Sequence, residues 1–304
     1  MTGQPLVSVG IPVYNGARFL PATLDALLAQ TLTDLEIVIS DNGSQDATEE
    51  VCRAYAARDP RIVYRRVEVN QGMGWNYNRT LELASAPLFM WNPADDLAKP
   101  GYLEACVDAL RRRPDAVLAF SDVEVVDEDG ALIESLSALG DDGSDPDESV
   151  RIRSFLEAEA WDVVYGVTRT DVLRAVGGMP PMVGDDVVLG VDLLARAPFV
   201  HVDGSLFQRR QHPEQSSAQH DPTAGQIQQD PTADPWFALS QWQINVELYR
   251  RVVRAPLPWR RRLAVARAVF GGWTYPTRRR LAGDLRRSVR TVARRARRTL
   301  SRRG

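Results

Sequence analysis

Apolar and polar positions along the first half of the chain predict buried strands separated by helices. The runs LVSVGIPV at 6–13 and LEIVIS at 35–40 are short, almost continuously apolar and rich in β-branched residues. Such runs indicate strands that are buried on both faces of a sheet. The segment 17–30 between them predicts a helix, because its leucines share one helical face: Leu20, Leu24, Leu27 and Leu28.

The same alternation continues through the first 126 residues and resumes later. Further strands are expected at 61–67, 87–91, 116–126 and 199–202, with helices at 78–84 and from Pro100 to about Arg113. Another helix should begin at Asp46, where Glu49 follows three residues later as in a capping box. Strands that alternate with helices predict an α/β fold, with a Rossmann-like, mostly parallel sheet flanked by helices.

Composition divides the chain into a first domain over 1–217 and two later parts. Within the first domain, residues 127–149 are acidic and contain Gly and Ser, which indicates a flexible surface insertion. Residues 218–235 repeat Asp-Pro-Thr-Ala and contain few apolar side chains, so we expect a linker or a lid there. Residues 236–304 predict a helical, arginine-rich C-terminal extension.

Overall composition excludes several classes of protein. The chain has 304 residues, of which 44% are hydrophobic and 25% charged, as is typical of a globular protein. The two cysteines, Cys52 and Cys106, both fall in expected helices, which excludes a disulfide scaffold. No apolar run reaches the roughly 18 residues of a membrane span, and the first ten residues lack the features of a secretory signal. We therefore expect a cytoplasmic protein.

The formal net charge of −3 conceals an uneven distribution. Residues 250–304 contain 19 arginines and one acid, Asp284, which leaves 18 basic and 39 acidic residues, or −21, in residues 1–249. Apolar residues at 281, 285, 289, 292, 296 and 300 give the tail the pattern of an interfacial amphipathic helix. An anionic membrane surface is the expected partner. A contact within the protein or in an oligomer and a solvated helix remain alternatives, and nucleic acid is unlikely as a partner.

Polar residues follow three of the expected strands. These strand ends read Pro12-Val13-Tyr14-Asn15-Gly16, Ser40-Asp41-Asn42-Gly43-Ser44 and Asn92-Pro93-Ala94-Asp95-Asp96. The carboxyl ends of parallel strands share the edge at which α/β proteins bind ligands. The sequence lacks the glycine-rich dinucleotide and phosphate-loop motifs, so a divalent cation on Asp95 and Asp96, Mn²⁺ or Mg²⁺, is expected to hold any phosphates. Read alone, the two acids favour a turn that caps the helix beginning near Pro100.

The order and spacing of these motifs resemble the family-two inverting glycosyltransferases, which have the GT-A fold. That family shows a strand ending in P-x-Y-N, a helix ending in glutamine, and E-I-x-V-x-D-D-G-S-x-D-x-T. The matching residues are Pro12, Tyr14, Asn15, Gln30, Glu36, Asp41, Gly43, Ser44, Asp46 and Thr48, with Asn42 in place of the second aspartate. The resemblance implies that Pro12, Tyr14, Asn15, Asp41 and Asn42 bind the nucleotide, with Tyr14 against the base and Asp41 hydrogen-bonded to it.

Later segments extend the resemblance to about residue 217. Asn70, Gly72 and Asn78 match N-x-G-x-x-x-x-x-N and imply further nucleotide contacts, although Tyr77 replaces the arginine common in the family. FMWNPADDLAKP at 89–100 resembles the family's metal site, which implies that Asp95 and Asp96 hold the cation. Arg210-Gln211-His212 resembles Y-R-x-H-x-x-x-S. It implies that His212 lies near the diphosphate or completes the metal shell, with a surface loop as the alternative.

The segment VGDDVVL at 183–189 resembles the family motif E-D-x-x-L, whose aspartate is the general base. Asp186 takes the place of that base, and Asp185 takes the place of the glutamate. A base has a clear purpose here, because an acceptor hydroxyl is a poor nucleophile until its proton is accepted. Two acids at a helix N-terminus, where the macrodipole favours them, are the structural alternative.

The sequence is thus identified as a member of this family, which implies a metal-dependent transfer of a sugar from a nucleotide diphosphate sugar to an acceptor hydroxyl, with inversion. A glycan or lipid-linked envelope precursor is the expected acceptor, and the enzyme would lie at the inner face of the cell membrane if its tail binds lipid. A nucleotidyltransferase is one alternative, although residues 12–18 contain a single glycine and a single arginine. A catalytically silent nucleotide-sugar-binding protein tethered by its tail is another.

Overall fold

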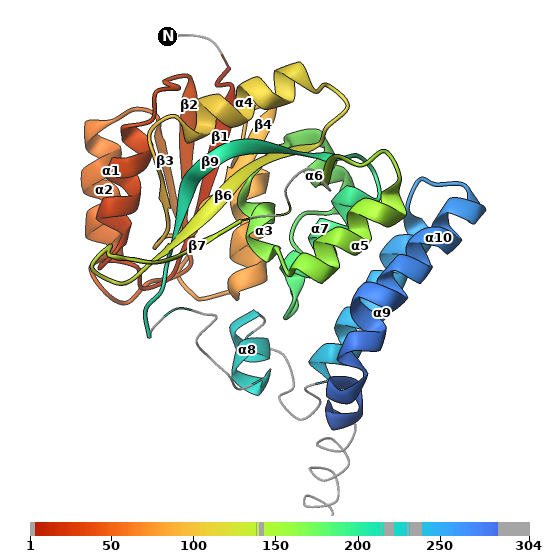
Figure 1. Cartoon of the computed structure of the whole chain (residues 1–304). Helices are drawn as coiled ribbons and strands as arrows, with labels where there is room; N and C mark the ends of the chain where they lie inside the picture. The colour runs from red at the N-terminus through yellow and green to blue at the C-terminus, as the bar shows by residue number, and fades with distance from the viewer. Residues whose placement is uncertain are drawn as a thin grey trace, which may run out of the picture.

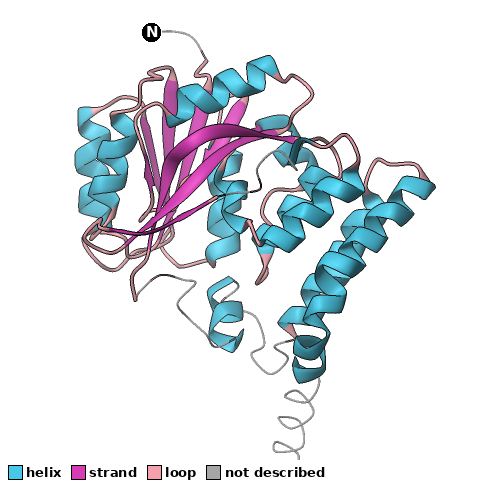
Figure 2. Cartoon of the chain, viewed as in Figure 1, coloured by secondary structure: helices cyan, strands magenta, loops and turns pink. Residues whose placement is uncertain are grey.

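The computed structural model describes residues 4–137, 139, 143–213, 215, 222–229, 231 and 239–284. In these residues a nine-stranded mixed sheet is flanked by helices (Figures 1 and 2). The strand order is β3-β2-β1-β4-β8-β6-β9-β5, and β7 pairs with β6 at the side of this path. The prediction of an α/β fold with a mostly parallel central sheet is confirmed.

The first half of the chain builds a parallel unit. β1 (Val7–Val13) lies between β2 (Leu35–Asp41) and β4 (Leu88–Trp91), and β3 (Ile62–Arg66) follows β2, all in parallel. All residues of β1 are buried, as expected for a strand covered on both faces. Each of these strands lies within one residue of its predicted bounds. The connecting helices are α1 (Leu20–Leu28), α2 (Thr48–Arg58), α3 (Met73–Leu83) and α4 (Tyr102–Arg112).

The second half adds antiparallel pairs. β8 (Val167–Arg169) lies antiparallel between β4 and β6 (Leu118–Val126), whereas β9 (Phe199–Arg210) runs parallel to β6 and pairs with the short β5 (Leu97–Ala98). The intervening helical elements are α5 (Glu148–Ala158), η2 (Trp161–Tyr165), α6 (Thr170–Val176) and α7 (Asp185–Leu194). β6 and β9 therefore run in the same direction as β1, β2 and β4 and end at the same edge of the sheet.

Several elements differ from their predicted extent. β9 continues eight residues beyond the predicted end at 202, because Gly204 (φ 94°) lies in a bulge where the register to β6 shifts. The acidic insertion contains β7 (Leu132–Leu136), whose largely exposed side chains leave no apolar pattern to read. α3 begins five residues earlier than predicted, directly after Gly72. Residues 138 and 140–142 of the insertion lie outside the described residues.

Residues 239–284 form a helical hairpin that shares the core of the first domain. α9 (Ser240–Arg254) is followed by α10 (Trp259–Val269) and the π-helical turn η5 (Phe270–Thr274), and the helix continues to Asp284. Their inward side chains pack in one cluster with α5 and α7: Ile244, Leu248, Val252, Val265, Val269 and Trp273. The predicted helical extension is thus packed onto the body, as Figure 1 shows. The tail beyond residue 284 lies outside the described residues.

Part of the predicted linker is helical. α8 (Pro222–Gln229) begins at a proline, which is favoured at the first helical position because its missing N–H would have no helical partner. Pro222 therefore marks the start of a helix, whereas the composition of the segment had indicated a linker. Residues 216–221 and 232–238, which include the predicted His220, lie outside the described residues.

The described residues contain neither a membrane-spanning helix nor a disulfide. None of the helices there is long and apolar enough to cross a bilayer. Cys52 and Cys106 are both buried and free.

Candidate functional site

The carboxyl ends of β1, β2 and β4 surround a cavity of about 220 Å³. Tyr14 and Asn15 follow β1, Asn42 follows β2, Asp95 follows β4, and His212 reaches the cavity from the segment after β9. The parallel arrangement explains this convergence, because it brings successive strand ends to one edge. Other lining residues include Pro12, Asn70, Met73, Asn76, Tyr77 and Gln228.

The loop after β1 is held by the motif that follows β2. Three backbone N–H groups donate to side chains there: Asn15 to Ser44 Oγ (2.9 Å), Gly16 to Thr48 Oγ1 (2.9 Å) and Ala17 to Asp46 Oδ2 (3.1 Å). Burial raises the pKa of Asp46, but hydrogen bonds from Thr48 and Ala17 outweigh it and leave the pKa lowered. These motif residues therefore shape the cavity without lining it.

The same contacts correct the predicted capping box at the start of α2. The Asp46 carboxylate also accepts from the N–H of Thr48 (3.1 Å). The Glu49 carboxylate, however, does not accept from the backbone N–H of Asp46, as a capping box requires. Glu49 instead accepts hydrogen bonds from Arg53 and Arg66. The arginines outcompete the backbone for this carboxylate because charge-assisted hydrogen bonds are stronger.

Asp41 and Asn42, both predicted to bind the nucleotide, lie at the end of β2. Asp41 is fully buried behind the cavity wall, where its carboxylate accepts from the Ser44 N–H (2.9 Å) and the Tyr64 hydroxyl (2.8 Å). Asn42 lines the cavity but is also buried, and its side-chain amide donates to Asn70 Oδ1 (2.9 Å) and to the Gly72 carbonyl (3.0 Å) and accepts from the Gln71 N–H (2.9 Å). Both residues therefore stabilise the loops that surround the cavity.

The motif around α3 also combines lining and supporting residues. Asn70 lines the cavity, and Gly72 (φ 96°) turns the chain into α3. Asn78 does not line the cavity: its amide clasps the backbone of Met179, donating to the carbonyl and accepting from the N–H at 2.8 Å each. The predicted ligand Asn78 therefore fastens α3 to the segment before α7.

Asp95 and Asp96 face different surroundings. Asp95 lines the cavity, whereas Asp96 is buried and its carboxylate accepts from the backbone N–H of Arg210 (2.8 Å). Burial and the neighbouring Asp95 raise the pKa of Asp96 well above its ordinary value. The Arg210 guanidinium donates to the carbonyl of Asp95 (3.1 Å), which fixes the acidic loop against the end of β9.

His212 supplies a second possible cation ligand. Its Nε2 lies 2.9 Å from Asp95 Oδ2, its ring packs against Phe19 (centroids 4.5 Å apart), and its buried Nδ1 has no partner in the described residues. No group of three metal-ligating side chains converges in that part of the chain. An imidazole and a carboxylate at one point still fit Mn²⁺ or Mg²⁺, because such ions usually share few protein ligands with substrate phosphates and water. Ser216 and Ser217 of the predicted motif lie outside the described residues.

Asp185 and Asp186 open α7 after Gly184 (φ 79°). Burial, together with Asp186, raises the pKa of Asp185 to about 8, although a hydrogen bond from Gln229 Nε2 (3.0 Å) opposes the shift. Burial raises the pKa of Asp186 to about 6. A carboxyl group with a pKa near neutrality is suited to accept a proton in a reaction. The pair titrates as a coupled unit.

Tyr77 connects the acid pair to the cavity. It lines the cavity and lies within electrostatic range of Asp185 as well as of Asp95 and Asp96. α8 makes a second connection, because Gln228 lines the cavity and Gln229 binds Asp185. Asp185 and Asp186 do not line the cavity themselves, and Tyr77 and α8 connect the pair to it.

Several site residues were not found from the sequence. Asn76 lines the cavity and donates to the Val13 carbonyl (3.3 Å), and Asp162 interacts electrostatically with both Asp96 and Asp186. Asp162 accepts from Arg209 (3.0 Å), a residue that stands where the predicted motif has tyrosine. The arginine at position 209, in place of the tyrosine of the motif, was the one signal in the sequence that pointed to Asp162. The others are brought to the site by tertiary contacts.

Comparison with known proteins finds similarity to glycosyltransferases in the N-terminal region. Residues 8–132 match the model of glycosyl transferase family 2. Chondroitin synthase of Escherichia coli is 31% identical over 129 residues, which are 42% of this chain and 19% of that protein. An uncharacterized glycosyltransferase of Rickettsia typhi is 34% identical over 128 residues, which are 42% of this chain and 39% of that protein. The chain spans less than half the length of these curated relatives.

Solved structures share the fold over most of the chain. S. aureus TarS 1–349 in complex with UDP-GlcNAc matches with a TM-score of 0.64 and 16% identity, over 88% of this chain and 73% of TarS 1–349. The mannosyltransferase PcManGT from Pyrobaculum calidifontis, in complex with GDP-Man and Mn²⁺, matches with a TM-score of 0.52 and 17% identity, over 95% of this chain and 87% of that one. The architecture is therefore the GT-A fold.

Proposed function

We propose that the chain, whose residues 8–132 match the model of glycosyl transferase family 2, is an inverting glycosyltransferase that uses a nucleotide diphosphate sugar. The observation that carries this proposal is the single site described above. Tyr14, Asn42, Asp95 and His212 line one cavity, and Tyr77 joins that cavity electrostatically to the acid pair at the start of α7.

The nucleotide binds at the ends of β1 and β2. Tyr14, with 47% of its surface exposed at the cavity, stacks on the base, and the amide of Asn70 bonds to the base or to the ribose, while Asn42 holds Asn70 in place. Asp41 supports this wall from behind. The ligands of the structural neighbours, UDP-GlcNAc in TarS and GDP-Man in PcManGT, support a nucleotide-sugar donor.

Asp95 and His212 would hold a divalent cation, with Asp96 fixing the acidic loop through its bond to the Arg210 N–H. Mn²⁺ or Mg²⁺ bound there would offset the charge that develops on the departing diphosphate. The Mn²⁺ in the PcManGT complex supports a metal in this fold. Arg210 keeps the acidic loop in place through its bonds to Asp95 and Asp96.

Asp186 acts as the base on the acceptor. Its raised pKa lets the carboxylate take the hydroxyl proton as the oxygen attacks the anomeric carbon, while the bond to the diphosphate breaks on the opposite face. A direct displacement of this kind inverts the anomeric carbon and forms no covalent enzyme intermediate. Asp185, hydrogen-bonded to Gln229, holds the start of α7.

The acceptor is a glycan or a lipid-linked envelope precursor. This part of the proposal rests on the arginine-rich C-terminal region, since about 1 kcal/mol per basic residue is available near an anionic leaflet. It places the enzyme at the cytoplasmic face of the membrane. Nucleotidyl transfer is less favoured, because the arginine in the loop after β1, Arg18, bonds to Glu128 (2.8 Å).

Calorimetry with UDP, GDP and dTDP tests the donor site. We expect one nucleotide to bind in Mn²⁺ with an affinity that falls at least tenfold in EDTA or in Asp95→Asn. Asp129→Asn, an exposed acid on the β6–β7 turn, is the matched control and should bind within twofold of the parent. Equal affinity in Mn²⁺ and EDTA would rule out the metal role, and binding of none of the three would count against the donor site itself.

A further inference from the structure

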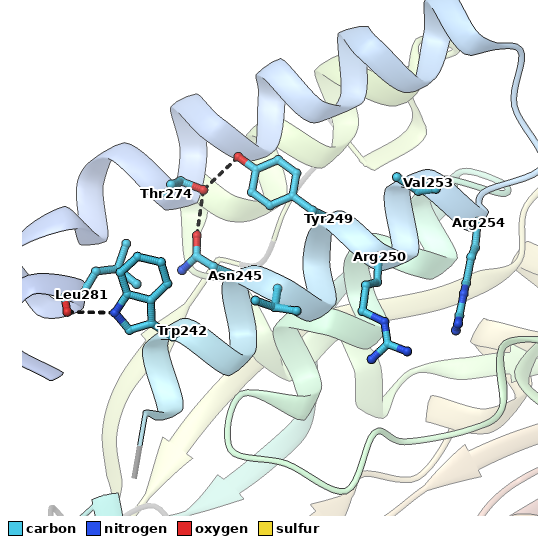
Figure 3. A pocket seen from close by; sticks show the side chains of 9 residues that line it. Trp242, Asn245, Tyr249, Arg250, Val253, Arg254, Thr274 and Leu281 are labelled. Atoms are coloured by element: carbon cyan, nitrogen blue, oxygen red, sulfur yellow. Dashed lines mark hydrogen bonds between the residues drawn. The ribbon is translucent and has the colours of Figure 1, made fainter. Parts of the chain in front are cut away.

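A groove of about 600 Å³ lies on the C-terminal hairpin, between α9 and the helical segment 270–284 (Figure 3). Its walls come from α9 on one side and from Thr274 and Leu281 on the other. Arg250 and Arg254 lie toward the end of the groove away from Leu281 (Figure 3). The α9 residues in the wall are Trp242, Asn245, Val246, Tyr249 and Val253.

α9 carries two apolar faces, of which the core needs one. Ile244, Leu248 and Val252 face the core and are buried. The second face points to the groove, where Val246 and Val253 keep 55% and 65% of their surface exposed. Helices on a protein surface usually have a polar outer face. The outer apolar face therefore indicates an occupant other than water.

The polar groups of the groove are largely satisfied within it. The Tyr249 hydroxyl and Thr274 Oγ1 share a hydrogen bond (3.1 Å), Thr274 donates to Asn245 Oδ1 (2.8 Å), and Trp242 Nε1 donates to the Leu281 carbonyl (3.0 Å; Figure 3). These bonds leave mainly hydrocarbon and ring surface open. An apolar chain that lay in the groove would break none of these hydrogen bonds.

The charge around the groove selects an anionic partner. Residues 250–284 contain ten arginines and one acid, Asp284, which is buried and accepts from the Gln241 N–H (2.9 Å). Three of these arginines pair with acids outside this range: Arg250 with Glu247, Arg251 with Asp192 and Arg261 with Glu148. The remaining seven still give the hairpin an excess of positive charge. On the second helical segment, Tyr275 is 55% exposed and the Arg278 guanidinium lies 4.0 Å from its ring centroid. Exposed aromatic rings beside arginines with long apolar stems are typical of a surface that lies in a membrane interface.

We propose that this face of the hairpin binds an anionic phospholipid bilayer, with the groove holding a lipid hydrocarbon chain and the arginines contacting the headgroups. This membrane site lies in the described hairpin, in addition to any contribution of residues 285–304. It rests on the groove and its charge and does not depend on the proposed sugar transfer.

The position of the groove relates the bilayer to the acid pair. The core face of α9 packs on the start of α7, where a Cβ added at Gly184 would lie 2.6 Å from Ile244 Cδ1. Asp185 follows Gly184 directly. The groove and the start of α7 therefore both contact α9. A membrane-bound acceptor would be held beside the residues proposed to act on it.

Vesicle sedimentation with the full chain tests the site. The vesicles contain phosphatidylcholine alone or with 30% phosphatidylglycerol, about the anionic fraction needed for a strongly negative surface. We expect binding to the anionic vesicles and a loss of at least tenfold in the partition coefficient for Val246→Glu/Val253→Glu. The matched control is Leu132→Glu/Ile133→Glu on β7, which adds the same charge at similarly exposed positions (60% and 52%) and should change binding less than threefold.

Two further measurements separate the alternatives. A chain that ends at Asp284 should keep measurable binding to anionic vesicles, and Trp242→Phe should reduce the quenching of tryptophan fluorescence by brominated acyl chains. Equal loss of binding in the groove and control variants would overturn the proposal and leave charge alone as the cause. A concentration-dependent dimer without lipid that the groove variant dissociates would overturn it in favour of a second copy of the chain.

Discussion

At the scale of single residues, the acid pair at the start of α7 has the clearest chemical consequences. Burial raises the pKa of both carboxyl groups, to about 6 for Asp186 and about 8 for Asp185. Near neutral pH the pair therefore carries one negative charge for much of the time, and it titrates with apparent values that belong to both residues. A single ionised carboxylate is what the proposed base requires.

Asp186→Asn should abolish turnover and spare donor binding. The amide cannot accept the proton of the acceptor, so kcat should fall by about 10² to 10⁴, while the Kd for the nucleotide stays within twofold. In the parent, kcat/KM should fall about tenfold per pH unit below about pH 6, as the base becomes protonated. A larger kcat effect from Asp185→Asn than from Asp186→Asn would contradict the assigned roles.

Asp185→Asn should change the pH dependence of stability. The pKa of Asp185 is about 8 in the fold and about 3.9 in the unfolded chain, so between pH 4 and 8 the folded state binds more protons and the free energy of unfolding falls as pH rises. Asparagine does not ionise, so the variant does not lose this stability as the pH rises. Relative to the parent, the variant should gain about 1 to 3 kcal/mol between pH 5 and pH 8 in urea unfolding, whereas Asp129→Asn should gain nothing. If the variant and the parent differed in free energy of unfolding by the same amount at pH 5 and pH 8, the raised pKa of Asp185 would be refuted.

At the scale of elements, the apolar pattern was enough for the parallel strands but not for elements stabilised by tertiary contacts. β1 and β2 are apolar runs covered on both faces, so their sequence alone predicts them. α5 was not predicted: its buried Arg151 donates to the Leu194 carbonyl, and the charge hid the helix from an apolar pattern. β9 was shortened in the prediction because its Asp-Gly-Ser bulge has the composition of a turn.

The site shows the same limit. The motifs after β1, β2 and β4 brought Tyr14, Asn42 and Asp95 to the cavity, because the position of a residue after a parallel strand fixes the edge on which it lies. Which motif residues point inward depends on side-chain contacts that the sequence does not contain. Asp41 and Asn78 accordingly turned out to be engaged in internal hydrogen bonds.

The contact between β1 and α3 provides a test of packing. A Cβ added at Gly10 would lie 2.6 Å from both Phe89 Cζ and Thr80 Oγ1. Gly10→Ala should therefore lower the free energy of unfolding by about 1 to 3 kcal/mol. Gly283→Ala is the matched control, since nothing lies within 4 Å of the added carbon and alanine is the better helix former. Its stability in urea should be unchanged or higher, and equal losses in the two variants would show that the contact is not the cause.

At the scale of the whole molecule, the acidic body and the basic C-terminal region are joined through one core. Two salt bridges cross between them: Arg251 binds Asp192 on α7 (2.7 Å), and Arg261 binds Glu148 on α5 (2.5 Å). Composition had indicated a separate extension, because charge describes the surface and not the inward face of a helix. The described hairpin is thus part of the folding unit.

Truncation distinguishes the integrated hairpin from the tail. A chain that ends at Asp284 should fold with nearly the parent Tm, because the buried residues of α9, α10 and η5 are all retained. A chain that ends at residue 238 exposes the core face of α7 and should be recovered as aggregate or without a cooperative transition in circular dichroism. A soluble, cooperatively folding protein from the shorter chain would contradict the shared core.

The central claim is the inverting transfer of a sugar from a nucleotide diphosphate donor at this site. Real-time proton NMR of the protein with Mn²⁺ and a panel of UDP, GDP and dTDP sugars, in the presence of a soluble glycan acceptor, tests it most directly. We predict that one donor releases its nucleoside diphosphate and that the first product has the anomeric configuration opposite to that of the donor. Asp186→Asn should be inactive under the same conditions. Retention of the anomeric configuration, or donor binding without cleavage by the parent protein, would contradict the account.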